Sequence, residues 1–386
     1  MGMRICYVAL VAMGSMAALA QNRYKPDINT ETPEGKMLQE AGQQQDDAKR
    51  LELIDKFLTA HASHPSAAWA LGQSVTSAQK LNQHDKVIAS SAKLLVLDGS
   101  DVEMAYAGLQ AAVAKADNDL IIHWARATAE AAKKATAAPE PKDEEEIERW
   151  KYKISFSKPD QAPKRAEYEL LNSAIRAQDP ATRLKLLEAL GALNPKSEYL
   201  PQVQPLIFAS YRQLNQNDKA LAYAAKATDA GTADEDMLLF LANNAFEKKD
   251  QPGVIRYADQ LSALLLTKAA PAGVDAAAWE KKKTISLGAG LWLKGMTFAA
   301  QSKWKETDTV LREAAPLLKG NDELLSHALF NIGLANYKMG NLNEALKFSQ
   351  DCAALKGPKQ AEAAKNAVVI RQQGGGAPAK KSAGKK

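Results

Sequence analysis

The stretch from Ser326 to Pro358 reads SHALFNIGLANYKMGNLNEALKFSQDCAALKGP. Its apolar residues recur every three or four positions, the spacing that gives a helix one buried face. Gly340 lies between two such runs, and a turn with a positive φ angle costs glycine little. The stretch therefore predicts two helices joined by a tight turn.

The same stretch resembles the tetratricopeptide repeat, position by position. The matching positions are Ala328, Ile332, Gly333, Ala335 and Tyr337 in the first helix, Gly340 in the turn, and Leu342, Glu344, Ala345, Leu346 and Phe348 in the second helix. Pro358 lies one place beyond the family's closing proline. The resemblance implies that Gly333 and Ala345 lie where the two helices cross closely, and that large residues such as Ile332 and Leu346 fill the space between hairpins.

Weaker copies of this pattern keep a period of 34 residues. One series of equivalent positions is Leu53, Val87 and Ile121, and a second is Leu186, Ala220 and Val254. A further copy runs from Leu291 to Leu318, and it departs from the family because Thr307 stands where alanine is usual. Internal repeats at such a period indicate a stack of helix hairpins, and the resemblance covers roughly residues 34–358.

Two segments interrupt the period, Ala137–Pro163 and Ala270–Ile285. Each has a proline-rich entry, then acidic residues or alanines, then a tryptophan (Trp150 or Trp279) followed by lysines. We expect each to be a long connection with an extended helix. Their likeness indicates either a duplicated block of about 130 residues or a chance similarity of two junctions.

These patterns predict an all-α fold, and the resemblance implies a right-handed superhelical array of tetratricopeptide-like helix hairpins, or α-solenoid. Strand-like alternation of Val, Ile and Thr is nearly absent from the sequence. The predicted segments are a signal peptide (1–20), N-terminal hairpins (21–136), an acidic connecting segment (137–163), middle hairpins (164–269), C-terminal repeats with a capping helix (270–372) and a disordered Lys-rich tail (373–386).

Residues 1–20 are expected to be a secretory signal peptide. Arg4 precedes the apolar run CYVALVAMGSMAALA, which closes on the small residues that signal peptidase requires, so cleavage is predicted before Gln21. A membrane anchor is the alternative, but fifteen apolar residues are too few to cross about 30 Å of hydrocarbon. No lipobox is present, and no later run is long enough for a transmembrane helix.

The net charge of +5 belongs mainly to the ends of the chain. Without Arg4 and the four lysines of the tail, 45 basic residues face 45 acidic ones. A neutral body argues against nucleic-acid binding, which needs a basic face. The tail could contact anionic cell-wall polymer or lipid headgroups, or serve only solubility.

No catalytic or cofactor-binding motif is found in the sequence, so we expect no enzyme activity and no cofactor. His61 and His64 are close enough to share a metal, but they precede Pro65 in a predicted loop without a third ligand nearby, so surface histidines are expected. Cys352, the one cysteine left after cleavage, takes a position that is usually alanine, which predicts a buried thiol rather than a nucleophile.

The resemblance also implies a concave groove lined by the first helix of each hairpin. The family's inward positions correspond to His327, Phe330, Leu334, Tyr337 and Lys338 in the last repeat, to Trp292 and Met296 in the repeat before it, and to Arg212 in the repeat that starts near Pro201. Aromatic and Met side chains suit a partner peptide or helix. The alternative is that some of them pack on a capping helix at Lys359–Arg371.

The function expected from these features is a non-catalytic protein-interaction scaffold, exported to the bacterial cell envelope or periplasm or secreted, which binds a partner peptide or helix in the groove. A second hypothesis is a structural component of an outer-membrane or cell-wall assembly machine with a wall-contacting tail. A third is a helical enzyme with an unrecognised site, which a deep polar pocket with clustered carboxylates would favour.

Overall fold

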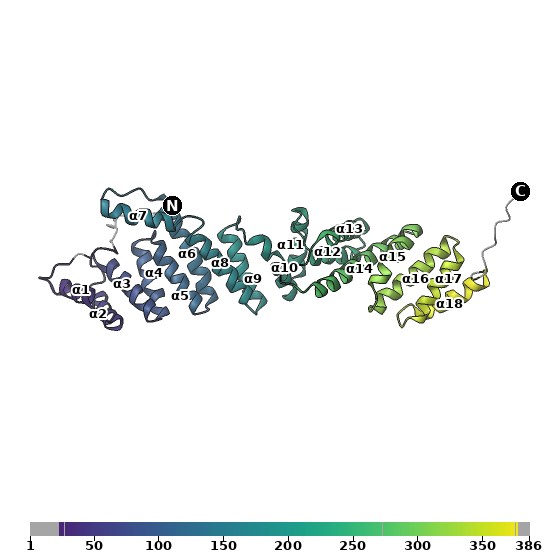
Figure 1. The fold of residues 1–386 in the computed structure, drawn as a ribbon, viewed down its shortest axis with the longest axis horizontal. Coiled ribbons are helices and arrows are strands. Elements are labelled where there is room, and N and C mark those ends of the chain that lie inside the picture. Colours follow the sequence, from purple (N-terminus) through teal and green to yellow (C-terminus); the bar gives the residue numbers. More distant parts are fainter. Residues whose placement is uncertain (1–22, 27, 272, 375, 377–386) are drawn as a thin grey trace, which may run out of the picture. The chain divides into compact units, whose positions relative to one another are not determined.

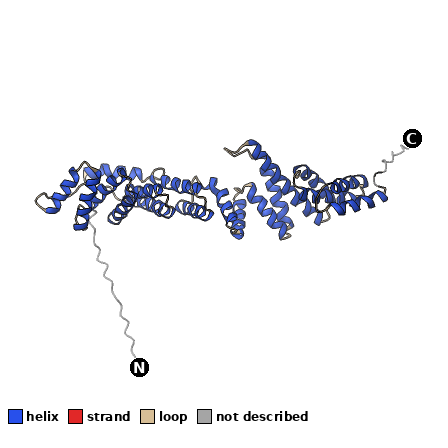
Figure 2. Cartoon of the chain, turned by 90° about the horizontal axis from the view of Figure 1, so that it is seen from below, coloured by secondary structure: helices blue, strands red, loops and turns tan. Residues whose placement is uncertain are grey.

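The computed structural model describes residues 23–26, 28–271, 273–374 and 376. The predicted signal peptide and most of the predicted Lys-rich tail lie outside these residues. The described part of the chain contains 18 helices and no strand, which confirms the all-α prediction (Figure 2). The chain forms two compact units, Met1–Ser210 (unit 1) and Tyr211–Lys386 (unit 2), and each is described by itself.

The described residues of unit 1 form nine complete helices (Figure 1). They are α1 (Pro33–Gln43), α2 (Asp47–Ala60), α3 (Ala67–Lys80), α4 (His84–Leu97), α5 (Val102–Ala114), α6 (Asn118–Ala137), α7 (Glu144–Phe156), α8 (Ala162–Arg176) and α9 (Pro180–Leu193). Helices α1 to α6 each pack on the next helix in the chain, and α8 packs on both α6 and α9. The boundary between the units falls inside α10 (Leu200–Gln213).

In unit 2, the part of the chain that the structure describes continues the same pattern with eight complete helices. They are α11 (Asn217–Asp229), α12 (Glu235–Glu247), α13 (Gln251–Thr267), α14 (Ala276–Ala300), α15 (Trp304–Leu317), α16 (Asp322–Lys338), α17 (Leu342–Ala354) and α18 (Gln360–Gln372). Each helix packs on its chain neighbour, and α12, α14, α16 and α18 also contact one another in that order. This sequential pairing makes the unit an α-solenoid of helix hairpins, as predicted.

A left-handed residue closes the turn inside six of the hairpins. Gly340 has φ +80°, as its role in the predicted turn requires, and the amide of Asn341 donates to the carbonyl oxygen of Asn336 at 2.8 Å. This bond belongs to the helix-ending motif that follows a left-handed residue. The other five turns place non-glycine residues in the same conformation: Asn82, Ala116, Asn215, Lys249 and Ser302.

Helices α16 and α17 cross closely at Gly333, as the repeat pattern implied. A Cβ atom at Gly333 would lie 3.1 Å from the Ser349 Oγ atom and 3.5 Å from the Ala345 carbonyl oxygen. Ile332 is fully buried between hairpins, in a cluster with Leu311 and Phe348. The predicted register of the last repeat is therefore confirmed.

The two interruptions of the period differ in structure. The second begins the 25-residue helix α14, whose Trp279 is buried against α12 and α13. The first holds a separate helix, α7, so the expectation of one extended helix is wrong there. Helix α7 ends at Phe156, just before Lys158-Pro159, because a residue before proline is disfavoured in the helical conformation.

Candidate functional site

A row of three half-buried aromatic rings crosses successive helices of unit 2. The ring centres of Phe246 on α12 and Trp292 on α14 lie 5.7 Å apart. Trp292 also meets His327 on α16 edge to face, with 6.3 Å between ring centres. Helices α12, α14 and α16 are the first helices of successive hairpins, and the row includes Trp292 and His327, two of the residues at the inward positions that the resemblance implies.

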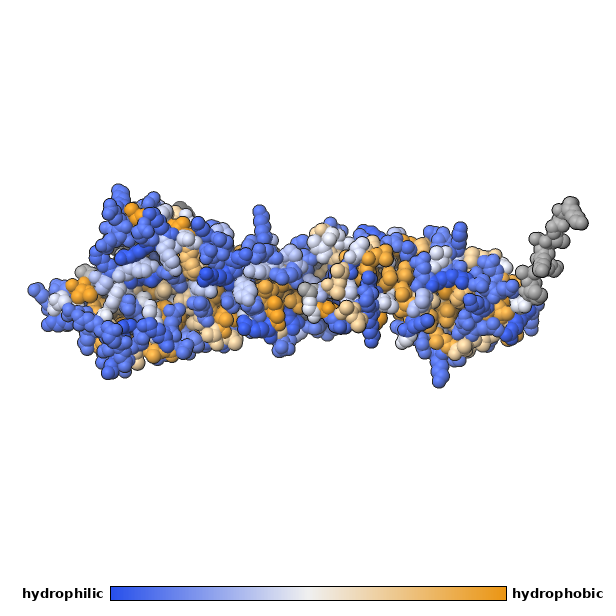
Figure 3. All heavy atoms as spheres, viewed as in Figure 1, coloured by the Kyte–Doolittle hydropathy of each residue, from blue (hydrophilic) through white to orange (hydrophobic). Residues whose placement is uncertain are grey.

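An apolar hollow of about 500 Å³ lies beside this row. Met296 lines it, and Asn331 donates its side-chain amide to the His327 carbonyl oxygen at 2.9 Å and to the Met296 sulfur atom at 3.4 Å. These bonds hold the Asn331 side chain in place at the hollow. The remaining lining residues come from α12 to α14 and the turn at Lys249: Phe246, Lys249, Gln251, Val254, Thr297, Ala299 and Ala300. In Figure 3, apolar residues reach the surface between polar ones over this part of unit 2.

The other predicted groove residues of the last repeat lie near the capping helix α18. Leu334, Tyr337 and Lys338 line a smaller hollow, of about 230 Å³, together with Asn366, Val369 and Ile370 of α18. The Lys359 ammonium group lies 4.8 Å from the centre of the Phe330 ring. These residues therefore have the C-terminal helix as a neighbour, which agrees in large part with the alternative that they pack on this helix.

Arg212 lies elsewhere in unit 2. Its guanidinium group stacks over the Phe240 ring at 4.0 Å, and it donates a hydrogen bond of 2.6 Å to the Asn217 side chain. The structure thus places Met296 in the lining of the hollow and Trp292 against the Phe246 ring that also lines it. Phe330, Leu334, Tyr337 and Lys338 lie at the cap, and Arg212 has other partners.

Phe246 and Asn331 belong to the site, but the sequence reasoning did not select them. Phe246 precedes the left-handed turn residue Lys249 by three positions, as Tyr337 precedes Gly340. Counting back from each turn would have found it. Asn331 offers no comparable signal, because its role depends on contacts with Met296 on another helix.

A buried carboxylate anchors α12 beside this face. Glu235 pairs with Lys268, and with Lys282 on α14 at 2.8 Å. Burial acts to raise the pKa of Glu235. The hydrogen bonds from the two lysines together outweigh this effect and hold the pKa of Glu235 below its usual range. Lys282 also bonds Asp236 at 2.7 Å, so a small ionic network fixes α12 against α14.

Cys352 is fully buried on α17, as predicted for a core thiol. Its thiol donates to the Ser326 carbonyl oxygen at 3.3 Å, and burial raises its pKa. His61 and His64 both pack against the Phe57 ring, at 5.5 and 5.4 Å between ring centres. Within the described ranges, no three His, Cys, Asp or Glu residues gather closely enough to hold a metal ion. None of the helices that the structure describes is long and apolar enough to cross a membrane.

Comparison with known proteins does not assign the chain to a family. No protein-family model matches the chain, and no curated protein matches it. Among solved structures the chain is similar to the TPR domain of P58(IPK), with 12% sequence identity, a TM-score of 0.26, and coverage of 89% of this chain and 99% of that one. The helix pairing described above, and not this likeness, defines the chain as an α-solenoid of helix hairpins.

Proposed function

We propose that the protein is a non-catalytic scaffold that holds a segment of a partner protein on the face formed by α12, α14 and α16. The observation that supports this is the aromatic row of Phe246, Trp292 and His327 beside an apolar hollow. Half-buried rings next to a hollow keep apolar area in water, and a bound partner would remove that area from water.

The lining of the hollow indicates the kind of partner. Met296 is flexible and polarizable, so it adapts to an apolar side chain of varied shape. The exposed Lys249 adds a positive charge for a carboxylate on the partner. A short peptide or helix that inserts one apolar side chain fits these features, and its binding should tolerate salt because apolar burial dominates.

We place the centre of binding at Trp292 and Met296. In this proposal Phe330, Leu334, Tyr337 and Lys338 extend the face toward α18, and Arg212 lies outside its centre. A partner seated in the hollow would be anchored by few residues, since a small number of buried aromatic and long side chains usually dominates an interface.

The proposal also includes export, so that the scaffold acts in the bacterial envelope or outside the cell. It is supported by the apolar run that ends at Ala18-Leu19-Ala20. Expression in a bacterial host, followed by fractionation and intact mass measurement, tests it: the periplasmic chain should begin at Gln21. Periplasmic material that still carries residues 1–20 would contradict it.

Site-specific photo-cross-linking tests the binding face in cells. We would place a photo-reactive residue at Ala300, which lines the hollow, and at Leu266, which is 75% exposed on α13 and about 18 Å along that helix from Val254. We expect a specific adduct from position 300 and none of the same mass from position 266. Equal adducts from both positions would contradict the proposed face.

The captured partner then allows two double variants to be compared. Phe246→Ala with Met296→Ala should weaken binding by about 2 kcal/mol or more, roughly thirtyfold. Phe330→Ala with Tyr337→Ala should weaken binding less. This second variant should also loosen α18, which amide exchange would show as lower protection of that helix. If the first variant stays folded and binds as before, the hollow is not the binding site.

A further inference from the structure

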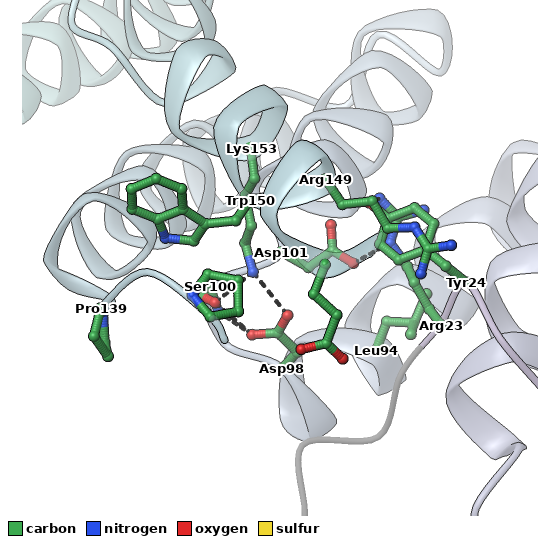
Figure 4. A pocket seen from close by; sticks show the side chains of 12 residues that line it. Arg23, Tyr24, Leu94, Asp98, Ser100, Asp101, Pro139, Arg149, Trp150 and Lys153 are labelled. Carbon is green, nitrogen blue, oxygen red and sulfur yellow. Dashed lines mark hydrogen bonds and ion pairs between the residues drawn. The ribbon is translucent and has the colours of Figure 1, made fainter. Parts of the chain in front are cut away.

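Two consecutive residues of a short segment before α1, Arg23 and Tyr24, line a hollow of unit 1 between the start of α5 and the helix α7 (Figure 4). The Arg23 Nε atom lies 2.5 Å from the Asp101 Oδ2 atom, and the guanidinium group also pairs with Glu103. The Asp101 side chain is only 6% exposed and that of Arg23 only 15%. Charge-assisted pairs with so little exposure are much less screened than surface pairs.

The neighbouring Tyr24 is held by the same group of residues. Its hydroxyl group donates to the Glu103 Oε2 atom at 2.8 Å. The guanidinium groups of Arg23 and Arg149 lie 4.1 and 5.1 Å from the centre of its ring, within the range of a cation–π interaction. Burial raises the pKa of Tyr24 to about 12, so the phenol stays a neutral donor at physiological pH.

Arg23 also lies near α3. A Cβ atom at Gly72 on that helix would lie 3.8 Å from the Arg23 Cβ atom and from the Arg23 carbonyl oxygen, an ordinary van der Waals distance. The segment is not helical: its residues form bends, α1 begins only at Pro33, and it contacts residues about eighty positions away in the sequence. A bent, non-helical segment is therefore bound here mainly through two side chains.

The hollow is larger than the segment that it holds. About 300 Å³ remains beside Arg23 and Tyr24, lined by Pro139, Pro141 and Trp150 and by polar side chains. Lys153 and Asp98 pair with each other there at 2.9 Å. Prolines and a tryptophan next to charged groups are suited to the continuation of an extended peptide beyond its anchoring residues.

We propose that this hollow is a second peptide-binding site, specific for a non-helical segment in which an arginine precedes an aromatic residue, and that Arg23 and Tyr24 of the chain occupy it in cis. The partner it fits is a protein with such a segment, which displaces the chain's own. Because the cis segment is tethered, its effective concentration is in the millimolar range, and a partner must compete with it. This inference is independent of the surface proposed in unit 2.

A peptide added in trans tests the proposal directly. The chain from Gln21 to Lys386 would carry Arg23→Ala with Tyr24→Ala, which empties the hollow, and would be titrated with a labelled peptide QNRYKPD, the sequence of residues 21–27. We expect saturable binding, at least tenfold tighter than to the unsubstituted chain, and a loss of at least tenfold when Glu103→Gln is added. A peptide with arginine and tyrosine exchanged serves as control.

The proposal is overturned if the emptied chain does not bind the peptide, if the unsubstituted chain binds it equally well, or if the exchanged peptide binds as tightly. A second measurement needs no emptied chain. Trypsin cuts after arginine, so Arg23 in its binding place should be protected from cleavage.

Asp101→Asn with Glu103→Gln should speed trypsin cleavage after Arg23 by at least tenfold, which corresponds to about 1.4 kcal/mol. Asparagine still caps the start of α5, where the Asp101 Oδ1 atom accepts from the Met104 amide at 3.2 Å. The matched control is Asp117→Asn, which changes the equivalent cap of α6 and should leave cleavage after Arg23 unchanged. Equal cleavage rates in all three chains would overturn the proposal.

Discussion

The indole ring of Trp124 lies directly against Gly108. A Cβ atom at that glycine would stand 2.3 Å from the Trp124 Cε3 atom, closer than any real side chain approaches, and the indole is 1% exposed. The crossing of α5 and α6 is therefore set by the absence of a side chain at one position.

We expect Gly108→Ala to destabilise unit 1 by about 1–3 kcal/mol, because Trp124 cannot move without disturbing a filled core. Gly191→Ala, near the end of α9, is the matched control: its Cβ atom would meet only Leu200 at 3.7 Å, an ordinary contact. That change should be neutral or stabilising, since alanine favours helix over glycine by about 1 kcal/mol. Amide exchange in α5 and α6 measures the difference, and equal protection in both variants would contradict the close crossing.

Gly333→Leu should loosen the last hairpin in the same way. The Cβ atom would already lie 3.1 Å from the Ser349 Oγ atom, and leucine adds three more carbon atoms at the crossing of α16 and α17. Because each hairpin contacts only its neighbours, we expect the loss of exchange protection to stay within α15 to α18. Unchanged protection there, or equal loss in unit 1, would refute this prediction.

The left-handed turns predict a stabilising substitution. Ala116 is exposed and has φ +51°, a conformation that is strained for a residue with a Cβ atom. Ala116→Gly should therefore stabilise the α5–α6 hairpin by about 0.5–1 kcal/mol, after the greater entropy of glycine in the unfolded chain is subtracted. The reverse change, Gly340→Ala, should destabilise its hairpin by a similar amount. Thermal unfolding of both variants checks the opposite signs.

The buried carboxylate of Glu235 predicts a pH effect. Its lowered pKa means that its pairing with Lys268 and Lys282 contributes stability above its usual pKa, and that this contribution disappears as the pH falls through the lower folded value. Glu235→Gln should therefore cost about 1.5–3 kcal/mol at neutral pH, and progressively less as the pH falls below the usual pKa of a glutamate, about 4.3. Asp234, whose pKa burial raises, is present in both proteins and cancels in this difference.

Amide exchange of α12 and α14, followed in both proteins across this range, measures that difference. A constant gap between Glu235→Gln and the parent chain at all pH values would show that the ionised form of Glu235 is not what stabilises the pair of helices.

Cys352 should react slowly with thiol reagents in the folded protein. Its sulfur atom is fully buried and its pKa is raised, so both access and the thiolate fraction are low. In the chain that begins at Gln21 it is the one thiol, and alkylation by iodoacetamide near pH 8 should proceed only as fast as α17 opens. Rapid alkylation without denaturant would contradict the buried placement.

The repeat itself could be predicted from the sequence because its determinants are local. The turn at Gly340, the close crossing at Gly333 and the apolar spacing of the two helices all lie within one hairpin. The separate helix α7 could not be predicted with the same ease, because the acidic run that precedes Trp150 fits the start of a long helix equally well.

The candidate sites were predicted only in part, since they depend on contacts between distant residues. Trp292 and Met296 were found by counting positions within a repeat, but their contacts with Phe246 and Asn331 join helices that are far apart in the sequence. The pairing of Arg23 with Asp101 spans more than two repeats. Nothing in the local sequence around Arg23 indicates which carboxylate it meets.

The one-after-another pairing of helices also has a mechanical consequence. Within unit 2, a pulling force between the first and last helices passes through the hairpin interfaces in series, so the weakest interface yields first while the others stay closed. Extension should then proceed in steps of about one hairpin, and release should let each hairpin close again on its intact neighbour. Unit 2 is thereby able to act as an elastic spacer that lengthens under load without losing its whole fold.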